Sequence, residues 1–333
     1  MFTARTLFPA LALCALPAFA AAPNTLTYLP ADAVAAGRLN LSDLRRDPLT
    51  RDLWTQMDDS ATDGDGAAFL NDAGLRIDDF DALTFGFAPA PSKPGDDRVI
   101  MVVEGRFDPA RLGAALLARG ATREANWYRL PDKDNDTDNH RGTGALAIVS
   151  DRLLLIGDEP SVSAALAGPA PAGALSGKIA RVSAGASGWM VIDAARLVKS
   201  EANDDTPRGG DAKFAGLIRS AGFFTGEFTL QGDRLAFTAR LESSDAQARA
   251  DLEDLIRGAF AAWRMAAQEK MPEMVEVIRG FGVKRDSAGV TVDGVLPGKA
   301  LRQLRDKARE RHAVEAKATT GGGSATGTAA AAR

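Results

Sequence analysis

Residues that commonly carry out covalent chemistry are scarce in this chain of 333 residues. Its single cysteine is Cys14, and its two histidines, His140 and His312, stand far apart in the sequence. A Ser–His–Asp triad requires a histidine beside a nucleophile turn, and a zinc site requires several cysteine or histidine ligands. Because neither histidine has such neighbours, the sequence predicts no catalytic residue, no cofactor-binding residue and no metal ligand.

One glycine pattern matches a known binding fingerprint but stands in the wrong context. Residues Gly142–Ala147 fit the pattern G-x-G-x-x-A, in which a tight turn brings the backbone close to a dinucleotide. That fingerprint follows a strand and opens a helix, whereas this stretch follows a polar loop and opens an apolar strand. We interpret it as the end of a loop and expect no nucleotide cofactor.

Acidic stretches leave a calcium-dependent structural or adhesive protein open as one alternative. Carboxylates alternate along Asp132–Thr137, as at the start of a calcium loop, where several oxygens surround a hard cation. However, Thr137 stands where such a loop needs glycine, and Thr143 stands where it needs a bidentate glutamate. We therefore interpret the stretch as a solvated loop. The same interpretation applies to the acidic cluster Asp58, Asp59, Asp63 and Asp65.

A hydrolase that works with paired carboxylates is the other alternative. The chain contains 44 Asp and Glu residues, and such an enzyme needs neither histidine nor cysteine. No spacing in the sequence marks a particular pair. This alternative therefore predicts a cleft with two facing carboxylates, without naming them.

The N-terminus has the pattern of a secretory signal peptide over residues 1–20. Arg5 provides a positive charge, Leu7–Leu16 forms a short apolar core, and Ala18–Ala20 is a small-residue cleavage site. Cys14 would leave with this segment, so the mature chain would contain neither a thiol nor a disulfide. We expect an exported protein, located in the periplasm or outside the cell.

Composition excludes two general classes of partner. The formal net charge is −4, which gives no general attraction for nucleic acid. Beyond the signal peptide, no run of about 18 apolar residues occurs, so we expect no membrane span.

A strand, a capped corner and a helix form the unit around which the chain is organised. Val99–Val103 is a continuous apolar run, which predicts a strand buried on both faces. Asp108 then precedes Pro109, a combination that favours the start of a helix. Apolar residues follow at helical spacing until Gly120, which is typical of a helix end.

The second half of the chain contains the same unit. Residues 234–241 predict a strand, Ser243–Asp245 a cap, and the residues after 246 a long amphipathic helix with a kink at Pro272. The apolar stripe that we expect to face the core is Leu252, Leu255, Ile256, Ala259, Phe260, Trp263, Ala267, Met271, Met274 and Ile278. Each unit is preceded by a further strand, which indicates an internal repeat.

The repeat predicts an α+β fold of two similar halves, each mainly antiparallel sheet with helices packed on one face. The predicted divisions are a signal peptide at 1–20, a first half at 24–168, a linker at 169–187, a second half at 188–316 and a disordered tail at 317–333. The linker is placed where large apolar residues are few and Gly, Ala, Ser and Pro are frequent. The basic residues of Lys299–Lys317 are interpreted as the solvated face of a last helix.

Three short phrases resemble those of an uncharacterised family of exported bacterial proteins with a two-part α+β layout. They are Leu29–Ala33, Gly105–Asp108 and Gly157–Val162. The resemblance implies the fold and export, but it carries over no catalytic residue, because the phrases are structural corners.

These observations together favour a non-catalytic, exported binding or interaction protein of the bacterial envelope. The expected partner is an unidentified envelope protein or an apolar small molecule held between the sheet and the helices. The carboxylate-based hydrolase and the calcium-dependent protein are the two alternatives.

Overall fold

The structure is a computed structural model that describes residues 24–51, 54, 64–89, 97–131, 144–168, 173–201, 221–304 and 306. The elements of the first half are η1 (Thr25–Tyr28), β1 (Ala35–Asn40), α1 (Leu41–Arg46), α3 (Gly64–Ala73), η2 (Ile77–Asp79), β2 (Phe80–Ala88), β3 (Arg98–Gly105), α4 (Pro109–Ala118), β4 (Thr122–Arg123), β5 (Tyr128–Arg129), β6 (Gly144–Ser150), β7 (Leu153–Asp158) and α5 (Glu159–Ala167). Those that follow are η3 (Gly173–Leu175), α6 (Ser176–Ile179), β8 (Gly188–Asp193), α7 (Ala194–Glu201), β9 (Phe223–Leu230), β10 (Arg234–Glu242), α9 (Ala246–Lys270), α10 (Pro272–Arg279), β11 (Gly282–Arg285) and β12 (Gly289–Pro297). A further helix occupies 298–304.

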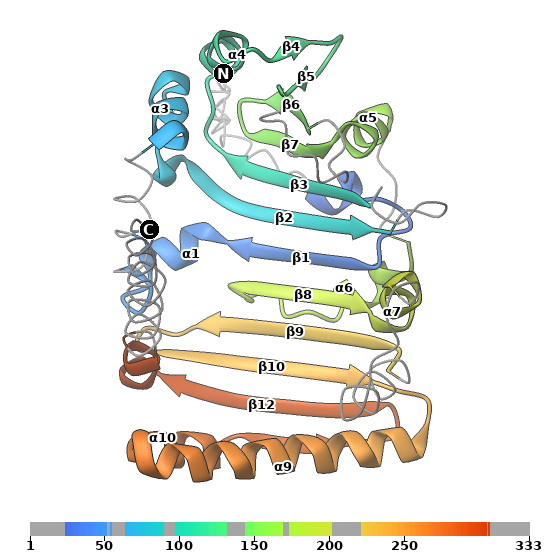
Figure 1. The fold of residues 1–333 in the computed structure, drawn as a ribbon, viewed down its shortest axis with the longest axis vertical. Helices are drawn as coiled ribbons and strands as arrows, with labels where there is room; N and C mark the ends of the chain where they lie inside the picture. The colour runs from blue at the N-terminus through green and yellow to red at the C-terminus, as the bar shows by residue number, and fades with distance from the viewer. Residues whose placement is uncertain are drawn as a thin grey trace, which may run out of the picture.

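The described strands all belong to one 12-stranded sheet with the order β11-β12-β10-β9-β8-β1-β2-β3-β7-β6-β5-β4. Figure 1 shows this sheet running through the molecule, with α4 near one end and α9 along the other. The order β1-β2-β3-β7-β6 repeats as β8-β9-β10-β12-β11, and the equivalent strands β1 and β8 pair antiparallel at the centre. The halves are therefore related by an approximate two-fold axis that passes near the paired residues Gly37 and Met190. The α+β class with two similar antiparallel halves is confirmed.

The predicted capped corners occur in both halves. Asp108 accepts hydrogen bonds from the backbone N of Ala110 at 3.0 Å and of Arg111 at 3.1 Å, and α4 begins at the next residue. Asp245 does the same for α9, accepting from the backbone N of Gln247 at 2.8 Å. An N-cap carboxylate satisfies backbone donors that have no partner inside the helix. These short polar stretches therefore fix where both helices start.

The helices divide between the two faces of the sheet. Helix α4 packs on Val103 and Leu154, and α9 packs on Val283 and Val290 at the other end of the same face. We call this the α4 face. Helix α5 covers the opposite side, the α5 face, where Val162 joins a buried cluster with strand residues of the first half.

Two expectations about burial were wrong. Val99 and Met101, in the strand predicted to be buried on both faces, are 46% and 37% exposed, because α4 covers this side of β3 at Val103 and leaves the earlier part of the strand open. Leu255 and Ala259 of the predicted core stripe are exposed, Leu255 by 45%, whereas Leu252 and Ala267 of the same stripe are buried as expected. The kink near Pro272 is confirmed as a break at Met271 between α9 and α10.

The described part of the predicted linker carries core residues. Leu175 is fully buried and Ile179 is buried, and both join the cluster beneath α5. Lys178 of α6 pairs with Glu242 of β10. The segment therefore packs against both halves, while the position of the boundary between them stays a prediction.

Several predicted features lie outside the described residues. They are the signal peptide at 1–20, the acidic stretch 132–137, His140, His312 and the tail at 317–333. The acidic cluster that ends at Asp65 was expected to lie in a loop, but Asp65 itself stands in α3, which begins at Gly64. The last helix begins at 298 and is described to 304.

The turn between β11 and β12 is held by one carboxylate. Asp286 accepts hydrogen bonds from the backbone N of Ala288 at 2.7 Å and of Gly289 at 2.9 Å, and from Nη2 of Arg240 at 2.9 Å. The hydrogen bond from Arg240 is the main reason why the pKa of Asp286 lies below its ordinary value of 3.8.

This contact predicts a particular dependence of stability on pH. Because the lower pKa belongs to the folded state, the carboxylate stabilises the fold above about pH 4 and loses this effect as the pH falls through the folded pKa. Asp286→Asn keeps an acceptor for the turn but removes the charge. Thermal unfolding followed by circular dichroism should give a Tm difference from the unchanged protein that is largest near pH 7 and shrinks in acid. Asp233→Asn, at an 87% exposed carboxyl, is the control. A difference that is constant from pH 7 to pH 3 would contradict the prediction.

Candidate functional site

The α4 face carries three rows of apolar residues that cross both halves of the sheet. The registers of the paired strands define these rows, because side chains of directly opposite residues lie on the same face. Each row runs from the first half of the sheet to the second. The first row is Ile156, Met101, Phe85, Gly37, Met190, Gly226, Ala239 and Val292, and the second row is Leu154, Val103, Leu83, Leu39, Gly188, Phe228, Phe237 and Gly294. The third row is Val99, Phe87, Ala35, Ile192, Phe224, Leu241 and Val290. No residue in these rows has a polar side chain.

The middle of these rows is open to solvent. Val99 is 46% exposed, and Met101 and Met190 are each 37% exposed, although all three stand in central strands. We call the open area the central patch and define it by its large side chains: Phe85, Phe87, Val99, Met101, Met190, Ile192, Phe224 and Phe228. Contiguous exposed apolar surface of this kind marks binding sites more often than isolated apolar residues do.

Glycines on the central strands let aromatic rings lie flat along the sheet. A Cβ atom built on Gly37 would lie 2.3 Å from the ring of Phe85, and one on Gly188 would lie 2.4 Å from the ring of Phe228. Each ring therefore occupies the space above a glycine on the neighbouring strand. The floor of the central patch consequently consists of ring faces and flexible methionine side chains, which adapt to varied apolar shapes.

The packed helices limit the size of the central patch. From β3 to β9 there are four strand spacings of about 4.8 Å, and three rows span about 14 Å along the strands, so the patch covers about 300 Å². Helix α4 packs on the sheet beyond one side of the patch, and α9 packs beyond the other side. An occupant must therefore fit between two helices that stand on the same face.

The opposite face of the same strands is polar at its centre. Arg38 pairs with Glu104, and its Nη1 donates to Thr84 Oγ1 at 2.9 Å and to Thr25 Oγ1 at 3.2 Å. Thr84 is fully buried, and η1 lies over this network. The group is closed by its own contacts, and we assign it a structural role.

The second half repeats the carboxylate of this network. Glu242 pairs with the first residue of β9, Phe223, as Glu104 pairs with Ala82 near the start of β2. Its cation comes from another element, because Lys178 of α6 binds its carboxylate and lies 4.5 Å from the centre of the Phe223 ring. Equivalent glutamates thus each bind a cation: Glu104 binds Arg38, which also donates to Thr25 of η1, and Glu242 binds Lys178 of α6.

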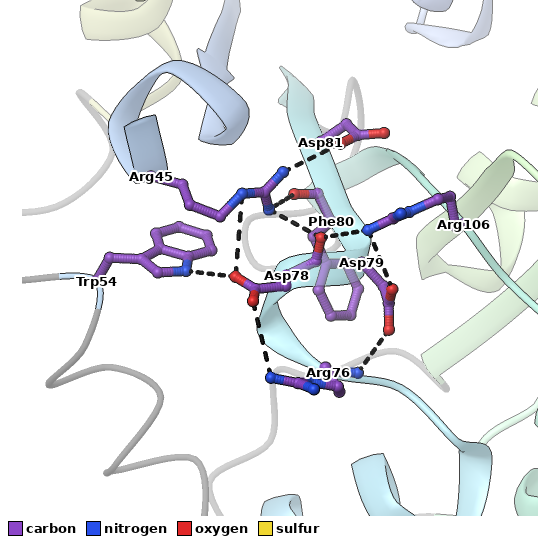
Figure 2. Close-up of polar contacts among 8 residues, drawn as sticks. All are labelled: Arg45, Trp54, Arg76, Asp78, Asp79, Phe80, Asp81 and Arg106. Atoms are coloured by element: carbon purple, nitrogen blue, oxygen red, sulfur yellow. Dashed lines mark hydrogen bonds and ion pairs between the residues drawn. The ribbon is translucent and has the colours of Figure 1, made fainter. Parts of the chain in front are cut away.

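A second charged group surrounds η2, just before β2 begins (Figure 2). Arg45 of α1 donates through Nη1 to the carbonyl oxygens of Asp78 at 2.8 Å and of Phe80 at 3.3 Å. Its Nη2 lies 3.5 Å from Asp81 Oδ1. One guanidinium therefore ties α1 to the turn that opens β2.

Two further side chains complete this group. Trp54, which is buried, donates from Nε1 to Asp78 Oδ1 at 3.0 Å. Arg106 donates to the carbonyl oxygen of Asp78 at 3.0 Å and lies 3.4 Å from Asp79 Oδ1. Its arginines and carboxylates face one another (Figure 2), rather than two carboxylates facing a cleft as a hydrolase would require. We assign the group to the structure of this corner.

The described residues contain no cluster of three or more His, Cys, Asp or Glu side chains that could hold a metal ion. Of the acidic positions considered for calcium, the stretch 132–137 is not described, so that alternative stays a prediction. In the part of the chain that the structure covers, no helix combines the length and apolar composition needed to cross a membrane.

Comparisons with known proteins give distant structural likenesses alone. A scan against protein-family models finds no match, and a search of curated proteins finds none. Crystal form I of TP0453 resembles the fold with a TM-score of 0.46 at 10% identity, over 85% of this chain and 96% of that chain. Crystal form III gives 0.49 at 11% identity, over 85% and 97%. Crystal form IV gives 0.47 at 12% identity, over 84% and 95%.

These likenesses are too distant to transfer a role to any residue of this chain. The resemblance to an uncharacterised exported family, inferred from three sequence phrases, stays a prediction because no family model matches. The central patch was not foreseen as a site. Its only sequence signal is the alternation of large apolar residues in β2, Leu83, Phe85 and Phe87, with smaller residues between them.

Proposed function

We propose that this protein is an exported, non-catalytic binding protein of the bacterial envelope that holds the acyl chain of a lipid-like molecule on its central patch. Export rests on the signal-peptide pattern of residues 1–20. The observation that carries the binding function is the run of three apolar rows whose middle is exposed to solvent.

The size and chemistry of the central patch support an acyl chain over a protein partner. Each partner in a standard protein interface contributes about 800 Å², whereas the patch covers about 300 Å². A second copy of the chain would also bring its own α4 and α9 against the helices that flank the patch. One leaflet of a bilayer is about 15 Å thick, so an acyl chain of that length fits within the open strands.

Binding of oleate tests this proposal. In the double variant Met101→Glu/Met190→Glu, two carboxylates would have to lose water against the bound chain, which is costly. We expect its affinity for oleate to fall at least tenfold, measured by isothermal titration and by native mass spectrometry. Both methionines are exposed, so the fold should persist, which circular dichroism checks.

A matched variant controls for the added charge. Leu255→Glu/Met265→Glu adds the same two charges at exposed apolar positions of α9, away from the central patch, and should bind oleate as the unchanged protein does. Sedimentation of both variants measures the oligomeric state in parallel. Equal oleate affinity in the two variants would contradict the proposal. So would a Met101→Glu/Met190→Glu variant that no longer forms a dimer but still binds oleate, because the patch would then be a protein interface.

A further inference from the structure

The central patch exposes two methionine side chains to solvent, and the thioether of methionine is readily oxidised. Met101 of β3 and Met190 of β8 are each 37% exposed, although both stand in central strands of the sheet. Phenylalanine, valine and isoleucine, which make up the rest of the patch, have no comparable group. The only cysteine of the chain, Cys14, lies in the predicted signal peptide, so no thiol is expected to compete for an oxidant in the mature chain.

Both methionines lie in the first apolar row of the patch. Met101 is directly opposite Phe85, and Met190 is directly opposite Gly37. The ring of Phe85 occupies the space above Gly37, so it fills the row between the two methionines. Their strands are three spacings apart, about 14 Å, so an acyl chain about 15 Å long that lies along this row would contact both side chains.

The other methionines that the structure describes have different surroundings. Met274 of α10 is fully buried, and Met271 packs against the same cluster. Met265 is 71% exposed on α9, away from the central patch. Oxidation of a side chain requires that the oxidant reach its sulfur atom. Met265 is therefore an exposed reference outside the patch, and Met274 is a buried one.

We propose that Met101 and Met190 form a redox-sensitive site, at which a peroxide converts both thioethers to sulfoxides and so releases the acyl chain. This inference rests on the proposed function of the central patch. In each reaction the sulfur lone pair attacks one oxygen of hydrogen peroxide, the O–O bond breaks and an S–O bond forms. The sulfur loses two electrons, and the second oxygen takes the proton of the transferred oxygen and leaves as water.

The sulfoxide makes the middle of the patch polar. Its oxygen is a hydrogen-bond acceptor that must give up water when an acyl chain covers it. The three apolar rows contain no polar side chain that could replace this water. Binding of the chain is therefore weakened, whereas the fold persists because both side chains already reach solvent.

Oleate affinity before and after oxidation tests the proposal. Hydrogen peroxide should weaken oleate binding at least tenfold, measured by isothermal titration, and methionine sulfoxide reductases of both stereospecificities should restore it. The circular dichroism spectrum should stay the same. An untreated protein that does not bind oleate would overturn the proposed function and this inference together. Equal binding once Met101 and Met190 are oxidised would overturn this inference alone.

Two variants test whether the effect comes from the patch. Met101→Leu/Met190→Leu removes both thioethers, so peroxide should leave its own starting affinity for oleate within twofold. Met265→Leu removes the exposed methionine of α9 and should lose affinity on oxidation as the unchanged protein does. A tenfold loss of affinity in oxidised Met101→Leu/Met190→Leu would place the effect elsewhere and overturn the proposal.

Protection by the ligand is an independent measurement. Saturating oleate should slow the oxidation of Met101 and Met190 at least fivefold, followed by mass spectrometry of peptides, because the bound chain covers both side chains. Met265 should react at the same rate with and without oleate, and Met274 should react more slowly than Met265 in both cases. If bound oleate left the oxidation rates of Met101 and Met190 unchanged, the chain would not lie on them and the proposal would be wrong.

Discussion

Gly173→Ala is expected to lower the free energy of unfolding by about 3 kcal/mol, although the sequence places this residue in a linker. Gly173 has a φ angle of +51°, and a Cβ atom there would lie 1.9 Å from the carbonyl oxygen of Ala31. An alanine must therefore adopt an unfavourable backbone conformation and also displace neighbouring backbone. Either movement would pull Leu175, which is fully buried, out of the core.

Gly177→Ala, four residues further on, is the matched control for Gly173→Ala. Nothing lies within 4 Å of a Cβ at this position, and Gly177 stands in α6. Because alanine favours helix more than glycine does, this variant should gain about 0.5 kcal/mol. Urea unfolding at equilibrium measures both variants. Gly173→Asn should still show most of the loss in unfolding free energy expected for Gly173→Ala. Asparagine tolerates the positive φ angle, but its Cβ atom would meet the carbonyl oxygen of Ala31 in the same way. Equal midpoints for the two alanine variants would show that residues 173–179 do not belong to the cooperative core.

Local features of this fold could be predicted from the sequence because they depend on neighbouring residues. Asp108 and Asp245 cap their helices as expected, since a cap requires only a carboxylate followed by free backbone N–H groups. The break at Pro272 follows from the missing N–H of proline. The repeat was visible because each half presents these signals in the same order.

The described part of the predicted linker shows that a composition poor in large apolar residues does not exclude burial. Residues 169–187 contain few large apolar side chains, and that is typical of an exposed connection. Two of those that do occur, Leu175 and Ile179, are buried in the core, and Val182 packs against the same cluster. The small residues around them permit close contact between backbones, as at Gly173, and composition alone does not distinguish this from flexibility.

The candidate site could not be predicted, because it depends on pairing between distant strands. The residues of β1 and β8 become neighbours only when the two halves join, and the register that aligns Gly37 with Met190 is a tertiary property. A continuous apolar run such as Val99–Val103 indicates burial on both faces. Here part of one face of β3 is left open, so Val99 and Met101 belong to the central patch instead of the core.

Glu104→Leu is expected to lower the free energy of unfolding by about 2–3 kcal/mol, as removal of one partner from a largely buried ion pair does. Arg38 and Glu104 side chains are 29% and 14% exposed, which places the effect at the lower end for such pairs. Without the carboxylate, the charge of Arg38 would face only the hydroxyls of Thr25 and Thr84. Urea unfolding with a constant m-value measures the loss.

The double variant Arg38→Met/Glu104→Leu should recover most of this stability, to within about 1 kcal/mol of the unchanged protein, because buried ion pairs contribute little beyond apolar packing. Thr25 and Thr84 can keep the 3.1 Å hydrogen bond between their hydroxyls after Arg38 is removed. The two-fold relation supports this expectation, since Val191, the equivalent of Arg38 in the second half, is apolar and fully buried. If the double variant were instead as unstable as the sum of its single variants, the ion pair itself would stabilise the sheet, and Glu242 with Lys178 would then be expected to contribute in the same way.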